Sequence, residues 1–124
     1  MTTRRPVRSE CGSASVLMIG IIAVVLALSS AALVIAGYAT GYHRARAAAD
    51  LSALSGAAAF EQGRDGCVQA RQTARQNGAR LDRCDLVGDV INFVVTVRVS
   101  VAARTRIPQL PRMVAAEAHA GPVR

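Results

Sequence analysis

The chain has 124 residues, 52% of them hydrophobic, and its fifteen basic and eight acidic side chains give a formal net charge of +7. All fifteen basic residues are arginine, a bias that we attribute to a GC-rich genome rather than to function. Because about 42 residues form a leader and an apolar run, only about 80 remain, which is near the lower limit for one small domain. A large enzyme is therefore excluded.

The first predicted element is a membrane-spanning helix. No charged side chain occurs in residues 11–42, and the apolar centre of this run, residues 16–36, has 21 residues. At about 1.5 Å per residue, that length crosses a hydrocarbon core roughly 30 Å thick. A cleaved secretory signal is the alternative, but its apolar region usually has only about 7–15 residues. Tyr38 and Tyr42 lie where interfacial anchors occur, which favours a retained span in the lipid bilayer.

The charges on the two sides of the span give a weak orientation bias. Three arginines and one acid precede the span in residues 1–12, whereas Arg44 and Arg46 follow it. Cys67 and Cys84 both lie beyond the span, and an oxidising extracytoplasmic compartment preserves such a pair. We therefore predict a single-pass cell-membrane protein with a cytoplasmic N-terminus and an extracytoplasmic C-terminal domain.

The membrane helix is predicted to continue outside the bilayer. Residues 43–62 contain strong helix formers, no proline and one glycine, so the helix should reach about residue 60. Measured over residues 16–60, it would be roughly 68 Å long, twice what a bilayer requires. A stripe of alanine and leucine at helical spacing predicts a packing seam, either against another helix or against the chain's own domain. This packing seam consists of Ala47, Leu51, Leu54 and Ala58.

A short second helix is predicted over residues 66–77. Residues 63–66 interrupt the first helix, and the Asp65 side chain is suited to cap the N-terminus of the second. Gly78 is suited to the left-handed conformation that ends a helix. The second helix should therefore have about three turns.

Three strands are predicted after the second helix. Every second side chain in residues 91–102 is large and apolar, and this two-residue period with one apolar face indicates a half-buried strand. Residues 81–87 precede this strand across a Gly88–Asp89 turn, which predicts a hairpin. A third strand is predicted at residues 113–120.

Together these elements predict an α+β fold. A long N-terminal transmembrane helix continues outside the membrane and is followed by a short helix and a small three-stranded antiparallel sheet. The predicted segments are a basic cytoplasmic leader at 1–12, a transmembrane helix at 13–42, a helix extension at 43–62 and a small extracytoplasmic α/β domain at 63–124.

The two cysteines beyond the span are predicted to meet. A helix over residues 66–77 rises about 18 Å, and an extended segment over residues 79–84 returns about 20 Å, which brings Cys84 back to the level of Cys67. Two buried free thiols or a metal site are the alternatives. No CxxC motif occurs and only two histidines are present, so zinc is disfavoured. We predict a Cys67–Cys84 disulfide and no metal.

The sequence contains no motif that indicates catalysis. We find no nucleophile motif, glycine-rich phosphate loop or metal-spaced cluster. His43 lies at the membrane edge, and His119 lies on the third predicted strand, where we expect it to face solvent. We therefore predict no enzyme activity, no catalytic residue and no cofactor.

A basic surface beside the second helix supports an alternative function. Such a surface would make the protein a membrane-anchored extracytoplasmic nucleic-acid or anion-binding protein. However, the chain has only two Phe and two Tyr to stack on bases, and a charged helix face is usually just solvated. Nucleic acid is therefore the less favoured partner. The residues of this basic surface are Arg71, Arg75, Arg80 and Arg83.

The leader ending at Gly12, the N-terminal span and the small α/β head resemble type IV pilins and pilin-like proteins. The segments RSECGSASVLMIGIIAVVLAL and HRARAAADLSALSGAAA, the cysteine pair and the terminal AHAGP together resemble the TadE-like proteins of the tight-adherence (Flp) pilus and secretion machinery. The likeness covers most of the chain, and its most specific part is the block at residues 44–54.

This resemblance implies a membrane-anchored minor pilin or pseudopilin that acts in assembly of a Flp-type pilus or a related secretion apparatus. The implied partners are pilin-like subunits, platform proteins and a prepilin peptidase, which would cleave between Gly12 and Ser13. Cleavage there would put Leu17 where pilins carry a glutamate, and no acid occurs in the span. We therefore expect a protein that assists assembly more than a major polymerised subunit.

Overall fold

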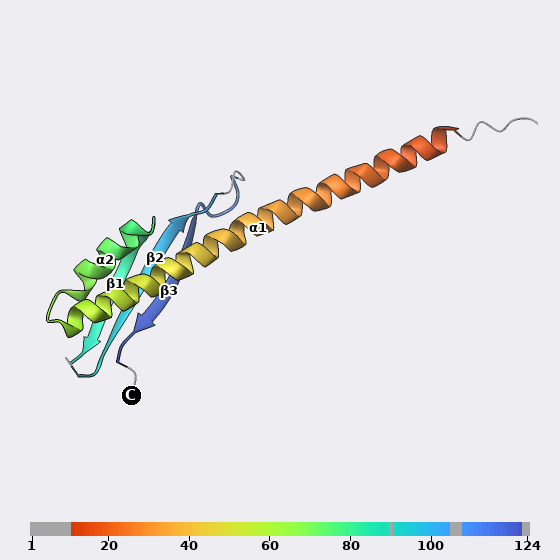
Figure 1. The fold of residues 1–124 in the computed structure, drawn as a ribbon. Coiled ribbons are helices and arrows are strands. Elements are labelled where there is room, and N and C mark those ends of the chain that lie inside the picture. The colour runs from red at the N-terminus through yellow and green to blue at the C-terminus, as the bar shows by residue number, and fades with distance from the viewer. Residues whose placement is uncertain (1–10, 90, 105–107, 123–124) are drawn as a thin grey trace, which may run out of the picture. The chain divides into compact units, whose positions relative to one another are not determined.

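The computed structural model describes residues 11–89, 91–104 and 108–122 (Figure 1). Two helices and a three-stranded antiparallel sheet of order β1-β2-β3 confirm the predicted α+β fold. Most of the leader, residues 1–10, lies outside the described residues. The elements are α1 (Cys11–Glu61), α2 (Gly66–Gln76), β1 (Arg80–Gly88), β2 (Phe93–Ala102) and β3 (Met113–Ala120).

The chain divides into two compact units between Ile35 and Ala36, so helix α1 contributes to both. In the first unit, the large apolar side chains of α1 are exposed, and this part of the helix is long and apolar enough to cross a membrane. Since exposed apolar side chains over such a length are stable in lipid rather than in water, this part of α1 is a candidate span for single-pass anchoring.

The second unit contains the rest of α1, which lies with α2 on one face of the sheet (Figure 1). The sheet supplies the largest fully buried side chains, Val95, Val97 and Val99, each 0% exposed. The rings of Phe60 and Phe93 meet edge to face, with centroids 4.7 Å apart. The buried residues that α1 presents to this core are small: Ala45, Ala48, Ala49, Ser52, Ala53, Gly56 and Ala57.

The packing seam lies on the other side of α1. All four of its residues are exposed, with Leu51 at 49% and Leu54 at 62%. The interpretation in which the seam packs against the chain's own domain is therefore wrong. The physical reason is that the sheet and α2 approach α1 too closely for leucine, so the alanine face of α1 is buried instead. Packing of the seam against another helix stays a prediction.

Two glycines form a close contact between the two helices. A Cβ atom added to Gly56 would lie 2.9 Å from the carbonyl oxygen of Gly66 and 3.3 Å from Val95 Cγ1. A Cβ atom added to Gly66 would lie 2.7 Å from the carbonyl oxygen of Gly56. These distances are shorter than carbon and oxygen atoms tolerate, so both positions require glycine.

The ends of α2 are formed as predicted. The backbone N–H of Val68 donates to Asp65 Oδ1 at 3.0 Å, which satisfies one of the free donors of the first turn. After the helix, Gly78 adopts a φ of 67°, a left-handed conformation that favours glycine. Helix α2 is therefore bounded by the local sequence rather than by its contacts with the sheet.

The register of the sheet sorts its side chains onto two faces. Cys84 pairs with Val97, and Val97 pairs with Ala118, on the face toward the helices. The hairpin is present, but its turn does not lie at Gly88–Asp89, because Gly88 belongs to β1 and pairs with Phe93. The Asp89 N–H donates to the carbonyl oxygen of Asn92 at 2.8 Å. The third strand has the predicted bounds, whereas β2 begins at Phe93 rather than at residue 91.

We expect Gly56→Ala to lower the free energy of unfolding by about 1–3 kcal/mol, because the new methyl group overlaps a backbone oxygen that cannot move aside. Helix propensity alone would predict the opposite sign, a gain of up to about 1 kcal/mol. Thermal unfolding of the full chain in detergent micelles, followed by circular dichroism, measures the difference. Gly20→Ala is the matched control, since no atom lies within 4 Å of its added Cβ. Equal melting temperatures for the two variants would contradict this account of the contact.

Candidate functional site

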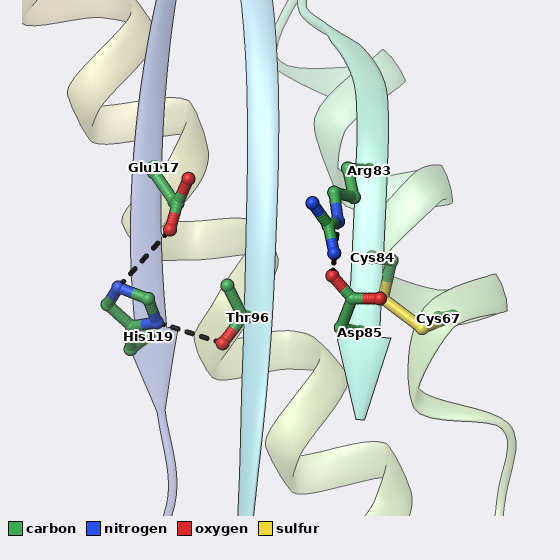
Figure 2. A network of polar contacts seen from close by, with 7 residues as sticks. All are labelled: Cys67, Arg83, Cys84, Asp85, Thr96, Glu117 and His119. Atoms are coloured by element: carbon green, nitrogen blue, oxygen red, sulfur yellow. Dashed lines mark hydrogen bonds and ion pairs between the residues drawn. A yellow bond between two sulfur atoms is a disulfide. The ribbon is translucent and has the colours of Figure 1, made fainter. Parts of the chain in front are cut away.

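A disulfide joins Cys67 at the start of α2 to Cys84 in β1, as predicted (Figure 2). The two Cα atoms are 5.9 Å apart, within the usual range for this bond. Because the sulfur atoms are bonded to each other, the alternatives of free thiols and of a metal site at these cysteines are excluded. The bond fixes α2 against the edge of the sheet.

Polar side chains occupy the outer face of the sheet, away from the helices (Figure 2). Thr96 Oγ1 and His119 Nδ1 share a hydrogen bond of 2.9 Å, and His119 Nε2 lies 3.5 Å from Glu117 Oε1. His119 is exposed, which confirms that it faces solvent. The Thr96–His119 contact connects β2 with β3, whereas Glu117 and His119 are both on β3. Pairs exposed to this degree contribute little to stability.

A shallow hollow of about 390 Å³ lies on the same outer face. Arg98 of β2 lines the hollow and lies opposite Arg83 of β1 and Glu117 of β3 in the sheet. Arg83 is bound to Asp85 at 2.5 Å, and Glu117 is turned toward His119. The hollow is lined by side chains of opposite charge, and its geometry supports polar contacts at the surface. Its lining residues are Arg83, Asp85, Val87, Thr96, Arg98 and Glu117.

The four arginines of the predicted basic surface do not form one face. Arg71 and Arg75 are exposed on α2. Because Cys84 points toward α2, the neighbouring Arg83 points to the opposite face of the sheet. Arg80 is bound to Asp82 at 2.9 Å, so two of the four guanidinium groups already have carboxylate partners. The structure thus separates these side chains into a helical pair and a pair on the sheet.

The remaining predicted site residues lie on α1. Gly12 and Ser13, the candidate peptidase junction, are both in the first turn of the helix. The packing seam is a continuous exposed stripe on the part of α1 that follows Ala36.

A second hollow, like the first, was not predicted from the sequence. It has a volume of about 150 Å³ and lies between α1 and the end of β2. Gly37 and Gly41, one helical turn apart, leave room on α1, and this spacing was the only local indication. We call it the juxtamembrane hollow. Its lining residues are Gly37, Thr40, Gly41, Arg44, Ala102 and Arg104.

No protein-family model, curated protein or solved structure matches the chain. Within the described part of the chain, no three histidine, cysteine or acidic side chains come together as metal ligands do. The function is therefore inferred from the span, the disulfide and the exposed surfaces of this chain.

We expect Cys67→Ser to lower the free energy of unfolding by about 3 kcal/mol, because the unfolded chain regains the freedom of a loop of 17 residues. Denaturant unfolding of the full chain in mild detergent measures the loss. Cys11→Ser is the control, since it leaves the disulfide intact. A dithiothreitol-treated native protein should match Cys67→Ser. Unchanged unfolding after reduction would contradict the assignment of this stability to the disulfide.

Proposed function

We propose that the protein is a membrane-anchored, pilin-like component of the TadE-like kind, which assists assembly of a Flp-type pilus or a related secretion apparatus. It acts through helix packing and protein contacts rather than through catalysis. The observation that carries the proposal is the exposed packing seam on the same helix that contains the candidate span.

The two faces of α1 after Ala36 differ in what they contact. The alanine face is buried against the sheet, whereas Leu51 is 49% exposed and Leu54 is 62% exposed. A helix that is apolar on both sides usually buries the second side against another element. Alanine beside leucine permits close approach of a second helix, which is the way in which membrane-anchored helices associate. The seam therefore suits a pilin-like subunit or a platform protein as its partner.

The disulfide supports the proposed orientation. Disulfides persist in oxidising compartments and are rare in the cytosol, so we assign the domain that follows the span to the extracytoplasmic side. The N-terminus then lies in the cytoplasm, and Gly12 and Ser13 lie at the start of the helix, where a prepilin peptidase would act. The separation of the four arginines gives the nucleic-acid alternative no continuous surface, so assembly is the function that we prefer.

A photoreactive amino acid at Leu51 should form cross-links to pilin-like or platform membrane proteins in native membranes. The matched control is Val94 on the outer face of the sheet, since the two side chains are equally accessible, at 49% and 47%. Leu54→Asp should reduce the Leu51 adducts about tenfold or more, because association would bury an unpaired charge. Mass spectrometry identifies the adducts. Identical adducts from Leu51 and Val94, or adducts unaffected by Leu54→Asp, would refute an assembly role for the seam.

The proposed orientation predicts how the three cysteines react in intact cells. After acid quenching and alkylation, Cys67 and Cys84 should resist a maleimide reagent until dithiothreitol is added, because they are bonded to each other. Cys11 should react without reduction, because we place it on the cytoplasmic side. Gel shifts on the full chain report the number of labelled thiols. Three reactive thiols before reduction would reverse the orientation.

A further inference from the structure

The juxtamembrane hollow lies at the level where the apolar run of α1 ends. Gly37 follows this run directly, and Arg44 is eight residues beyond Ala36, or about 12 Å along the helix. The headgroup layer of a bilayer is roughly 5–8 Å thick on each side, and helical side chains point back toward the N-terminus. The Arg44 side chain is therefore directed toward the layer in which lipid phosphates lie.

Glycine gives the hollow its shape. A Cβ atom on Gly37 would be 4.0 Å from the carbonyl oxygen of Arg104, so the segment after β2 passes close to α1 at this level. Gly41 contacts β3 on the same side of the helix, where an added Cβ would lie 3.5 Å from Val114 Cγ2. Larger side chains at Gly37 or Gly41 would fill the space. The hollow has a volume of about 150 Å³, many times the roughly 10–15 Å³ that one water needs. This volume leaves room for a phosphate group.

The two arginines of the hollow have no partner among the described residues. Neither Arg44 nor Arg104 forms an ion pair or a side-chain hydrogen bond with residues 11–89, 91–104 or 108–122. By contrast, the nearby Arg46 is 3.6 Å from Asp50. No acidic side chain of the described chain lines the hollow. Two cations that share a hollow repel each other, and an anion between them removes this repulsion.

We propose that the juxtamembrane hollow binds a phosphate group, held between the guanidinium groups of Arg44 and Arg104. Guanidinium groups bind phosphate oxygens through paired N–H donors, a geometry that lysine does not provide. The level of the hollow on the helix favours the headgroup phosphate of an anionic phospholipid over free phosphate. Such a lipid would fix the head domain at the membrane surface. This inference rests on the span and not on the assembly function proposed above.

Native mass spectrometry of the full chain in detergent, titrated with phosphatidylglycerol, tests the site. Arg44→Gln with Arg104→Gln should weaken lipid binding about tenfold or more, because both charge-assisted contacts are lost. The matched control is Arg71→Gln with Arg75→Gln, which removes the same charge from α2 and should leave the affinity within about twofold. A loss in the control as large as in the hollow variant would overturn the site.

Two further arms separate a built site from general attraction and lipid from free phosphate. Gly37→Leu keeps both arginines but fills the hollow, so it should also weaken phosphatidylglycerol binding several-fold, with an unchanged circular dichroism spectrum. Full binding by Gly37→Leu would show diffuse attraction and overturn the site. Phosphatidylcholine, which has no net charge, and inorganic phosphate at equal concentration should both fail to displace the lipid. Displacement by inorganic phosphate would overturn the lipid assignment.

Discussion

The contact between Gly56 and Gly66 determines how closely α1 and α2 approach each other and the sheet. The carbonyl oxygen of each glycine lies less than 3 Å from the position that an added Cβ atom would take on the other glycine. The two helices therefore touch through their main chains. Val95 fills the space beneath this contact. Larger residues at either position would separate the helices and open the core above β1 and β2. The disulfide and the buried alanines both depend on this short distance.

This close packing has a cost and a benefit. A core built from alanine on the helices and valine on the strands removes little apolar area per residue, so a domain of this size needs covalent support from a disulfide. In return, the leucines of α1 are not needed inside. They stay available on the outer side of the helix, where a second protein can cover them. The same constraint therefore explains both the small core and the exposed packing seam.

Much of the fold could be predicted because its indications are local. Three features each determine the structure of the residues next to them: the alternating side chains of β2, the cap at Asp65 and the glycine at position 78. The face of α1 that the sheet covers could not be predicted in this way. Hydrophobic periodicity predicts that the helix face with leucines is buried. In α1 the face with alanines is buried instead, because the backbones lie close together.

The juxtamembrane hollow was missed for a different reason. Arg44 and Arg104 are 60 positions apart in the sequence, and only the position of the end of β2 beside α1 brings them to the same hollow. Among the candidate site residues, the cysteine pair was found because an estimate of helix and strand lengths was sufficient. The division of the four arginines between α2 and the sheet depended on strand register, which composition does not reveal.

If the domain is exported as we propose, the disulfide also makes that export directional. Before the bond forms, a core of alanine and valine provides little resistance to unfolding, so the chain can pass through a translocation channel in extended form. In the proposed orientation, oxidation occurs only after both cysteines have crossed. The closed loop between Cys67 and Cys84 can then no longer be extended to a single strand. Backward movement through the channel is blocked, and the domain is retained on the far side by covalent chemistry.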